Sequence, residues 1–191
     1  MTRKIAQLGL FLSLALILAY VESLIPFSFG IPGIKLGLPN LIVVILLCGG
    51  SAGRSSGYPN EAVGSVINRN GAKEALLVNG LRIVLSGFLF SNLYTILYAL
   101  AGALLSFIAM LIGRRMGCFS VVGVSVLGGV FHNIGQIIVA MFVVETVYVG
   151  YYVPFLIVAG TVTGAILGIV AMELMPYIVR FIGYSQPIDS Y

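Results

Sequence analysis

The chain has 191 residues, of which 60% are hydrophobic and 8% charged, and its formal net charge at pH 7 is +4. Soluble domains carry about 25% charged residues and cannot hide this much apolar surface, so the composition excludes an ordinary soluble protein. In a membrane protein, basic residues mark the cytoplasmic side, and the positive charge therefore needs no nucleic acid as a partner. The two cysteines, Cys48 and Cys118, lack the spacing of a disulfide framework or a metal site.

Six apolar segments predict an all-α membrane protein, a six-transmembrane-helix bundle that forms one domain over residues 1–191. A spanning helix needs about 20 mainly apolar residues, a length that five of the segments reach. The second segment is shorter, so it must extend into its flanks or enter the membrane only partway. The basic start of the chain also fits a secretory signal, but the long apolar run without a small-residue cleavage site favours an uncleaved first helix. The segments cover approximately residues 5–25, 38–50, 73–90, 93–112, 119–144 and 152–179.

The basic residues between these segments predict which side of the membrane each connection faces. Lysine and arginine are enriched in cytoplasmic loops. With the N-terminus inside, the external segments contain only Lys35, and six crossings return the C-terminus to the cytoplasm as well. The cytoplasmic segments then contain Arg3, Lys4, Arg54, Arg69, Lys73, Arg114, Arg115 and Arg180.

Residues 51–70 differ from the other connections between predicted helices. Their sequence, SAGRSSGYPNEAVGSVINRN, is rich in glycine, serine and asparagine. This composition predicts a flexible cytoplasmic loop. Its glycines do not match a phosphate-binding loop, because no Gly-Lys-Ser/Thr follows them.

Small residues three or four positions apart predict where the helices pack closely. Membrane helices associate through the close backbone approach that such stripes permit. The clearest stripe is Gly160, Gly164 and Gly168 in the last segment, and the fourth and fifth segments contain others. We interpret these stripes as packing within the chain. For Ala15 and Ala19 in the first segment, both packing within the chain and docking of a partner subunit remain as alternatives.

Strongly polar side chains also lie at membrane depth, where each costs several kcal/mol unless it is paired or hydrated. Arg82 lies near the middle of the third segment, with Asn79 one turn earlier. The only histidine, His132, lies near the middle of the fifth segment, where Gln136 shares its helix face and Asn133 flanks both.

Three further polar residues lie near the predicted outer surface. Glu22 lies near the outer end of the first segment, and Lys35 and Asn40 frame the first external loop, GIPGIKLGLPN. Charges at helix ends are tolerated because long side chains can reach the interface. Position alone therefore favours a function for these three residues less than for Arg82.

Two interpretations of these polar residues remain open. In the first, they hold the bundle together: Glu22 pairs with Arg82 or Lys35, and the other side chains bond to neighbouring helices. Such bonds average only about 0.6 kcal/mol, which seldom justifies an arginine at mid-membrane. In the second, they line a polar cavity for a small anionic or amide-bearing solute, because ionisable groups inside a membrane are functional by default.

Four stretches carry a resemblance to a known family. They are PGIKLGLPN, GAKEALLVNGLRIVLSGFLF, YALAGALLSFIAM and GVSVLGGVFHNIGQ. They closely resemble the bacterial Gx transporter family, whose members are often labelled heptaprenyl diphosphate synthase component I. The family is distantly similar to the substrate-binding S components of energy-coupling factor (ECF) transporters. The resemblance covers nearly the whole chain except residues 51–70.

The resemblance implies an S-component-like bundle in the bacterial plasma membrane, surrounded by membrane lipids, that captures a small-molecule solute from outside. Glu22 is then a candidate for an ion pair or proton transfer, and Ala15 and Ala19 for docking an ECF-type coupling subunit. ATPase subunits would be separate chains, because no nucleotide-binding motif occurs here. The residues that the resemblance nominates for substrate binding are Lys35, Asn40, Asn79, Arg82, His132, Asn133 and Gln136.

The label of a prenyl synthase can be tested against the residues. Prenyl-chain elongation uses clustered aspartates that hold Mg²⁺, whereas the only aspartate here is Asp189 in the C-terminal tail. A serine or cysteine nucleophile would need His132 as its base and an orienting acid nearby, which the sequence does not supply. We therefore predict no catalysis, no metal and no cofactor. The alternative function is a non-catalytic membrane accessory subunit in prenyl diphosphate or quinone metabolism.

Overall fold

The computed structural model of the protein describes residues 2–24, 37–55 and 71–184, and every regular element in these ranges is a helix. The prediction of an all-α protein is confirmed for this part of the chain. The elements are α1 (Thr2–Leu24), α2 (Asn40–Ser55), α4 (Gly71–Phe90), α5 (Leu93–Met116), α6 (Val121–Val143), η1 (Val147–Tyr152) and α7 (Val153–Tyr184).

The structure places one boundary differently from the sequence. α2 continues to Ser55, so the first residues of the predicted loop 51–70 are helical, and the remainder of that loop lies outside the described residues. The physical reason is that small residues such as Ala52 are compatible with a helix, and the first proline of the stretch, Pro59, comes only later. Composition alone did not locate the end of this helix.

Four stretches of the described helices are long and apolar enough to cross a membrane. They are Ile5–Leu24, Leu93–Met116, Val121–Val143 and Val147–Ile178. The chain is therefore a helical protein of the multi-pass membrane type. α2 has only 16 residues, and α4 carries Lys73, Glu74 and Arg82, which keeps both outside this set.

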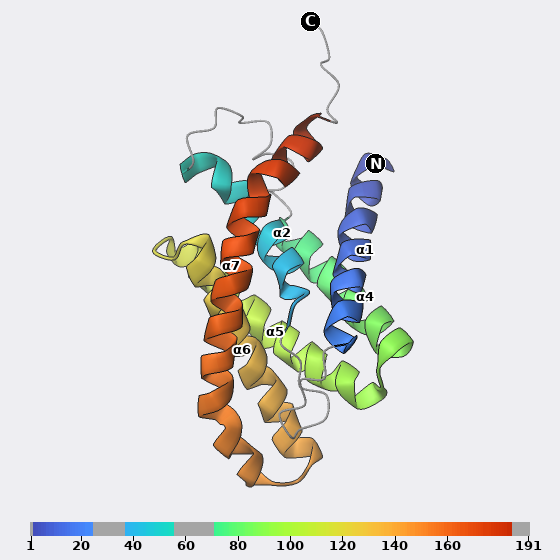
Figure 1. The fold of residues 1–191 in the computed structure, drawn as a ribbon, viewed down its shortest axis with the longest axis vertical. Coiled ribbons are helices and arrows are strands. Elements are labelled where there is room, and N and C mark those ends of the chain that lie inside the picture. The colour runs from blue at the N-terminus through green and yellow to red at the C-terminus, as the bar shows by residue number, and fades with distance from the viewer. Residues whose placement is uncertain (1, 25–36, 56–70, 185–191) are drawn as a thin grey trace, which may run out of the picture.

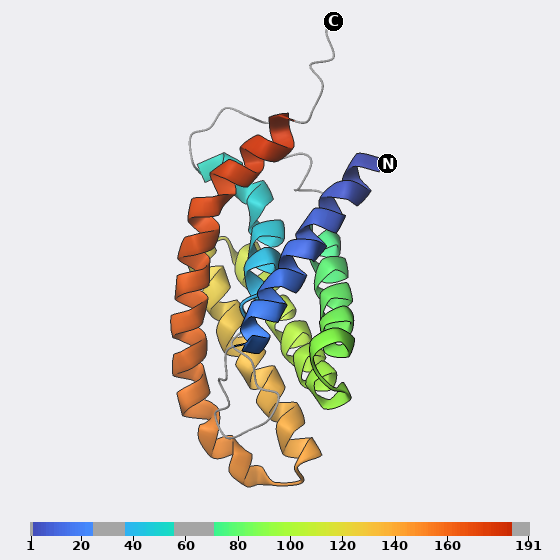
Figure 2. The same ribbon diagram turned by 45° about the vertical axis from the view of Figure 1, so that its right-hand side comes forward.

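The long helices run in alternating directions along the molecule (Figure 1). The beginning of α1 and the end of α7 lie at the same end of the molecule in both views (Figures 1 and 2). α6 and α7 are joined through η1 into a long hairpin that extends beyond the other helices at the opposite end.

α2 occupies the centre of the bundle. It packs against α1, α4, α6 and α7, and all eight residues from 41 to 48 are buried. A helix that is apolar on every side is expected to be enclosed by other helices. The central position explains how this short helix can be strongly apolar without presenting a face to lipid.

Glycines set the contact between α6 and α7. A Cβ atom on Gly129 would lie only 2.3 Å from the carbonyl oxygen of Gly160, and Gly164 and Gly168 also meet the backbone of α6. The predicted packing role of the glycine stripe in α7 is confirmed. Close backbone contact of this kind is a principal source of helix association in membranes.

α1 lies at the periphery and contacts only α2 and α4 closely among the described helices. Its small residues Ala15 and Ala19 point inward and are buried against this chain. α1 exposes large apolar side chains, among them Leu10, Ile17 and Tyr20, together with small residues such as Gly9 and Ser13. Ala15 and Ala19 are thus enclosed by the neighbouring helices of this chain, and their docking of a partner subunit stays a prediction.

Candidate binding site

Glu22 begins the candidate site at the junction of α1 and α2. Its side chain is buried, and its carboxylate accepts hydrogen bonds from the backbone N–H of Gly37 and, at 3.4 Å, of Leu38. Gly37 adopts a positive φ of 83°, a conformation that glycine reaches without strain. Through these hydrogen bonds, Glu22 connects the end of α1 to the turn that precedes α2.

Asn40 is the first residue of α2 and lies just past this turn. Its backbone N–H donates to the carbonyl of Gly37 at 2.8 Å, and its side chain is buried. The side-chain oxygen Oδ1 has no hydrogen-bond partner within the described ranges. A Cβ on Gly37 would lie 3.0 Å from Asn40 Nδ2 and 3.4 Å from His132 Cδ2, so this turn joins α2 to α6.

Arg82 and Asn79 enter from α4. Both are buried, and Arg82 Nη2 donates to Asn79 Oδ1 at 2.6 Å, which satisfies part of the guanidinium. Arg82 Nε is left without a partner among the residues that the structure describes. Glu22 and His132 are also neighbours of Arg82 inside the bundle. The arginine therefore faces the interior of the bundle and not the lipid.

His132 and Gln136 form the α6 side of the site. Gln136 is fully buried, yet neither Oε1 nor Nε2 has a partner in the described chain, and His132 Nδ1 has none either. Both side chains pack on Gly102 of α5, where a Cβ would lie 2.9 Å from His132 Nδ1 and from Gln136 Cγ. Glycine at position 102 therefore leaves the space that these two side chains occupy.

Asn133 points elsewhere, although it is adjacent to His132 in sequence. Its Nδ2 donates to the carbonyl of Leu156 on α7 at 2.8 Å, and Gly160 leaves room for that contact. This bond connects α6 to α7 within the bundle. This bond is what the interpretation of the polar residues as interhelical contacts expects, and a substrate contact by Asn133 stays a prediction.

We call Asn40, Arg82, His132 and Gln136 the polar cluster. All four are at most 6% exposed, and each has at least one side-chain atom without a partner among the described residues. Asn79 and Glu22 flank it, on α4 and α1. Lys35, the remaining predicted site residue, lies outside the described residues.

Two further buried residues on α5, Ser106 and Tyr98, lie one turn to either side of Gly102. Ser106 lies one turn beyond Gly102 on α5, is buried, and its hydroxyl has no partner in the described ranges. Its small size placed it with the packing residues. Tyr98 is also buried, but it packs with Ile137 and Leu156 in an apolar cluster and does not join the polar cluster.

The chemistry available here is recognition by hydrogen bonding and charge. The polar cluster offers a cationic donor in Arg82, an acceptor in Asn40, and both a donor and an acceptor in Gln136. Among the described residues, no group of three or more histidine, cysteine, aspartate or glutamate side chains could hold a metal ion. A small solute with complementary groups is the ligand that such an arrangement can bind.

A family model connects this geometry to known sequences. The model described as heptaprenyl diphosphate synthase component I matches residues 11–53 and 52–174. The chain belongs to this family. The two matched segments meet within the last residues of α2, and the second one includes the 52–70 stretch, which the sequence resemblance had left out. No curated protein and no solved structure matches the chain.

Proposed function

We propose that this family member is a membrane-embedded, S-component-like protein that binds and helps take up a small anionic or heteroaromatic metabolite. In this proposal the polar cluster is the binding site, and Glu22 and the turn at Gly37 close it at the end of α1. Coupling and ATPase subunits on separate chains would supply the energy for uptake. Lys35 stays a predicted contributor from the adjoining loop.

The observation that carries the proposal is the set of atoms in the polar cluster that lack a hydrogen-bond partner among the described residues. A buried polar atom without a hydrogen bond costs about 1–3 kcal/mol. Packing would be served better by apolar side chains of similar size, since those carry no such cost. The cost is understandable if a bound solute satisfies these atoms, with an acidic group on Arg82 and an amide-like edge on Gln136.

We further propose that all six α-helices, the short α2 included, cross the bacterial plasma membrane, with both termini in the cytoplasm. The start of α1 and the end of α7 lie at one end of the molecule, as an even number of crossings requires. α2 would span about 24 Å, less than the about 30 Å of a hydrocarbon core, and its burial among neighbouring helices removes the need to meet lipid directly.

Thiol labelling tests this orientation. Cys118 is exposed in the turn between α5 and α6, whereas Cys48 is buried in α2. A membrane-impermeant maleimide is expected to label Cys118 in inside-out vesicles but not in intact cells. Labelling in intact cells would place this turn outside and reverse the topology.

Ligand-induced thermal stabilisation tests the function. Purified protein is screened against vitamins, cofactors and their precursors, because a ligand of the folded state raises the unfolding temperature. Arg82→Leu is expected to abolish the stabilisation by any compound that acts on the wild type, while the variant remains folded. Asn133→Leu is the matched control, since it also replaces a buried polar residue and should retain the response.

A second candidate function follows from the family description, which names one component of a synthase. On this view the chain is a non-catalytic accessory subunit of prenyl diphosphate metabolism, and its polar residues only stabilise the bundle. Arg82→Leu would then leave function intact and stability unchanged or raised. A well-folded preparation that no compound of the panel stabilises would favour this alternative.

A further inference from the structure

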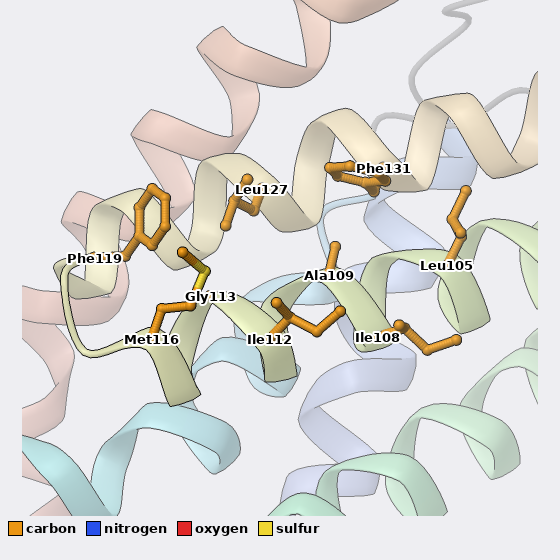
Figure 3. Close-up of a pocket in the computed structure, with 9 residues that line it drawn as sticks. All are labelled: Leu105, Ile108, Ala109, Ile112, Gly113, Met116, Phe119, Leu127 and Phe131. Atoms are coloured by element: carbon orange, nitrogen blue, oxygen red, sulfur yellow. The ribbon is translucent and has the colours of Figure 1, made fainter.

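An apolar groove lies between α5 and α6, separate from the polar cluster. Nine apolar residues line it, from Leu105 to Met116 on α5 and from Phe119 to Phe131 at the turn and on α6 (Figure 3). Its volume is about 260 Å³. For comparison, an engineered apolar cavity of about 150 Å³ already accommodates benzene.

Small residues in α5 create the groove. Ala109 and Gly113 form its floor, between larger residues such as Ile108 and Ile112, which are 45% and 53% exposed. On the other side, Leu127 comes so close that a Cβ on Gly113 would lie 2.6 Å from its Cδ1. In a protein that crosses a membrane, an exposed apolar groove of this kind faces hydrocarbon chains.

The length of the groove matches one leaflet of a bilayer. From Leu105 to Met116 an α-helix rises about 16 Å, which is about half of the about 30 Å hydrocarbon core. The groove ends where α5 ends, at Gly117 in the left-handed conformation. It therefore runs from the membrane surface to about the midplane, the depth that one acyl chain of that leaflet occupies.

A positive charge lies at the surface end of the groove. Arg115 is exposed and follows Ile108 by seven residues and Ile112 by three, so it continues the same face of α5. The neighbouring Arg114 is half-buried and lies on the side of α5 that is near Cys48 of α2. Arg115 is thus placed beside the position that the headgroup of a lipid in the groove would take.

We propose that this groove binds an anionic phospholipid, with one acyl chain along α5 and α6 and its phosphate at Arg115. Basic residues at the membrane surface attract anionic lipids by about 1 kcal/mol each. For one arginine this corresponds to about a fivefold preference over a zwitterionic lipid with the same chains. The proposal needs a membrane-embedded bundle but does not depend on the solute bound by the polar cluster.

Lipid binding to the delipidated full-length chain tests the proposal. Native mass spectrometry compares phosphatidylglycerol with phosphatidylcholine of identical chains, and the wild type is expected to bind the first about fivefold more tightly. Arg115→Gln should remove the preference, and Arg115→Lys should restore most of it. Lys73→Gln, which removes an exposed cation on α4 outside the groove, should leave it unchanged.

A second pair of variants tests the groove itself. Ala109→Phe fills the floor and should reduce binding of both lipids, whereas Val158→Phe on the exposed face of α7 should not. Equal binding of the two lipids by the wild type would overturn the proposal. A lipid-independent dimer that Ala109→Phe disrupts would also overturn it, because the groove would then be a contact between two copies of the chain.

Discussion

Two residues on α6, Asn133 and Gln136, are equally buried but differ in what their side chains do. Asn133 donates a hydrogen bond to the Leu156 carbonyl on α7, while both amide atoms of Gln136 are without partners among the described residues. On the face of α6 that carries Asn133, the polar side chain is hydrogen-bonded within the bundle. On the face that carries Gln136, it has no such bond among the described residues. Burial alone does not separate these two residues, whereas the hydrogen bonds that their side chains make within the described residues do.

The glycines at the contacts of α6 also differ between its α7 side and its α5 side. On the α7 side, Gly129 and Gly160 bring two backbones together, with no space for even a methyl group. On the α5 side, Gly102 accommodates the side chains of His132 and Gln136. Glycine serves helix association on one face and makes room for polar groups on the other.

The largest effect is expected on the α7 face. Gly129→Ala would force a methyl group against the Gly160 carbonyl, and since the obstacle is backbone, the helices must separate. We expect a loss of about 3 kcal/mol in the free energy of unfolding, measured by denaturant titration in detergent micelles. Gly80→Ala on α4 is the matched control, because its Cβ would meet nothing within 4 Å. Equal stability of the two variants would show that the α6–α7 contact is looser than described.

A smaller effect is expected at the turn beside the polar cluster. Gly37→Ala places a side chain at a positive φ, which costs about 1–2 kcal/mol, and its methyl group crowds Asn40. We expect reduced stability together with weaker binding of any compound that stabilises the wild type. Reduced stability with unchanged binding would separate this turn from the site.

Asn133→Leu should have a still smaller effect on stability. It removes one interhelical hydrogen bond, which is worth about 1 kcal/mol. Thr163→Val is the control, because the Thr163 hydroxyl donates to the carbonyl of Ala159 within its own helix. If both variants unfold at the same free energy as the wild type, the bond to Leu156 contributes nothing to the α6–α7 contact.

The sequence predicted the helical architecture and much of the cluster for identifiable reasons. Hydropathy locates apolar helices because a segment in lipid must be apolar and must hydrogen-bond its own backbone. Helical spacing placed His132 and Gln136 on one face of their helix. The central position of α2 could not be predicted, because a short segment that is apolar all round gives no direction to its neighbours. The roles of Gly37 and Gly102 were also missed, since both depend on side chains that come close only in the folded bundle.

The role of Gln136 is tested most sharply by the unfolding free energy of Gln136→Met, measured with and without a compound that stabilises the wild type. Methionine keeps the approximate volume of glutamine and removes the two polar atoms that have no partner in the described part of the chain. We predict that the variant without ligand is at least as stable as the wild type and that it no longer responds to the compound. A loss of stability comparable to that of Asn133→Leu, with the ligand response retained, would show that Gln136 has a structural partner and would contradict the central claim.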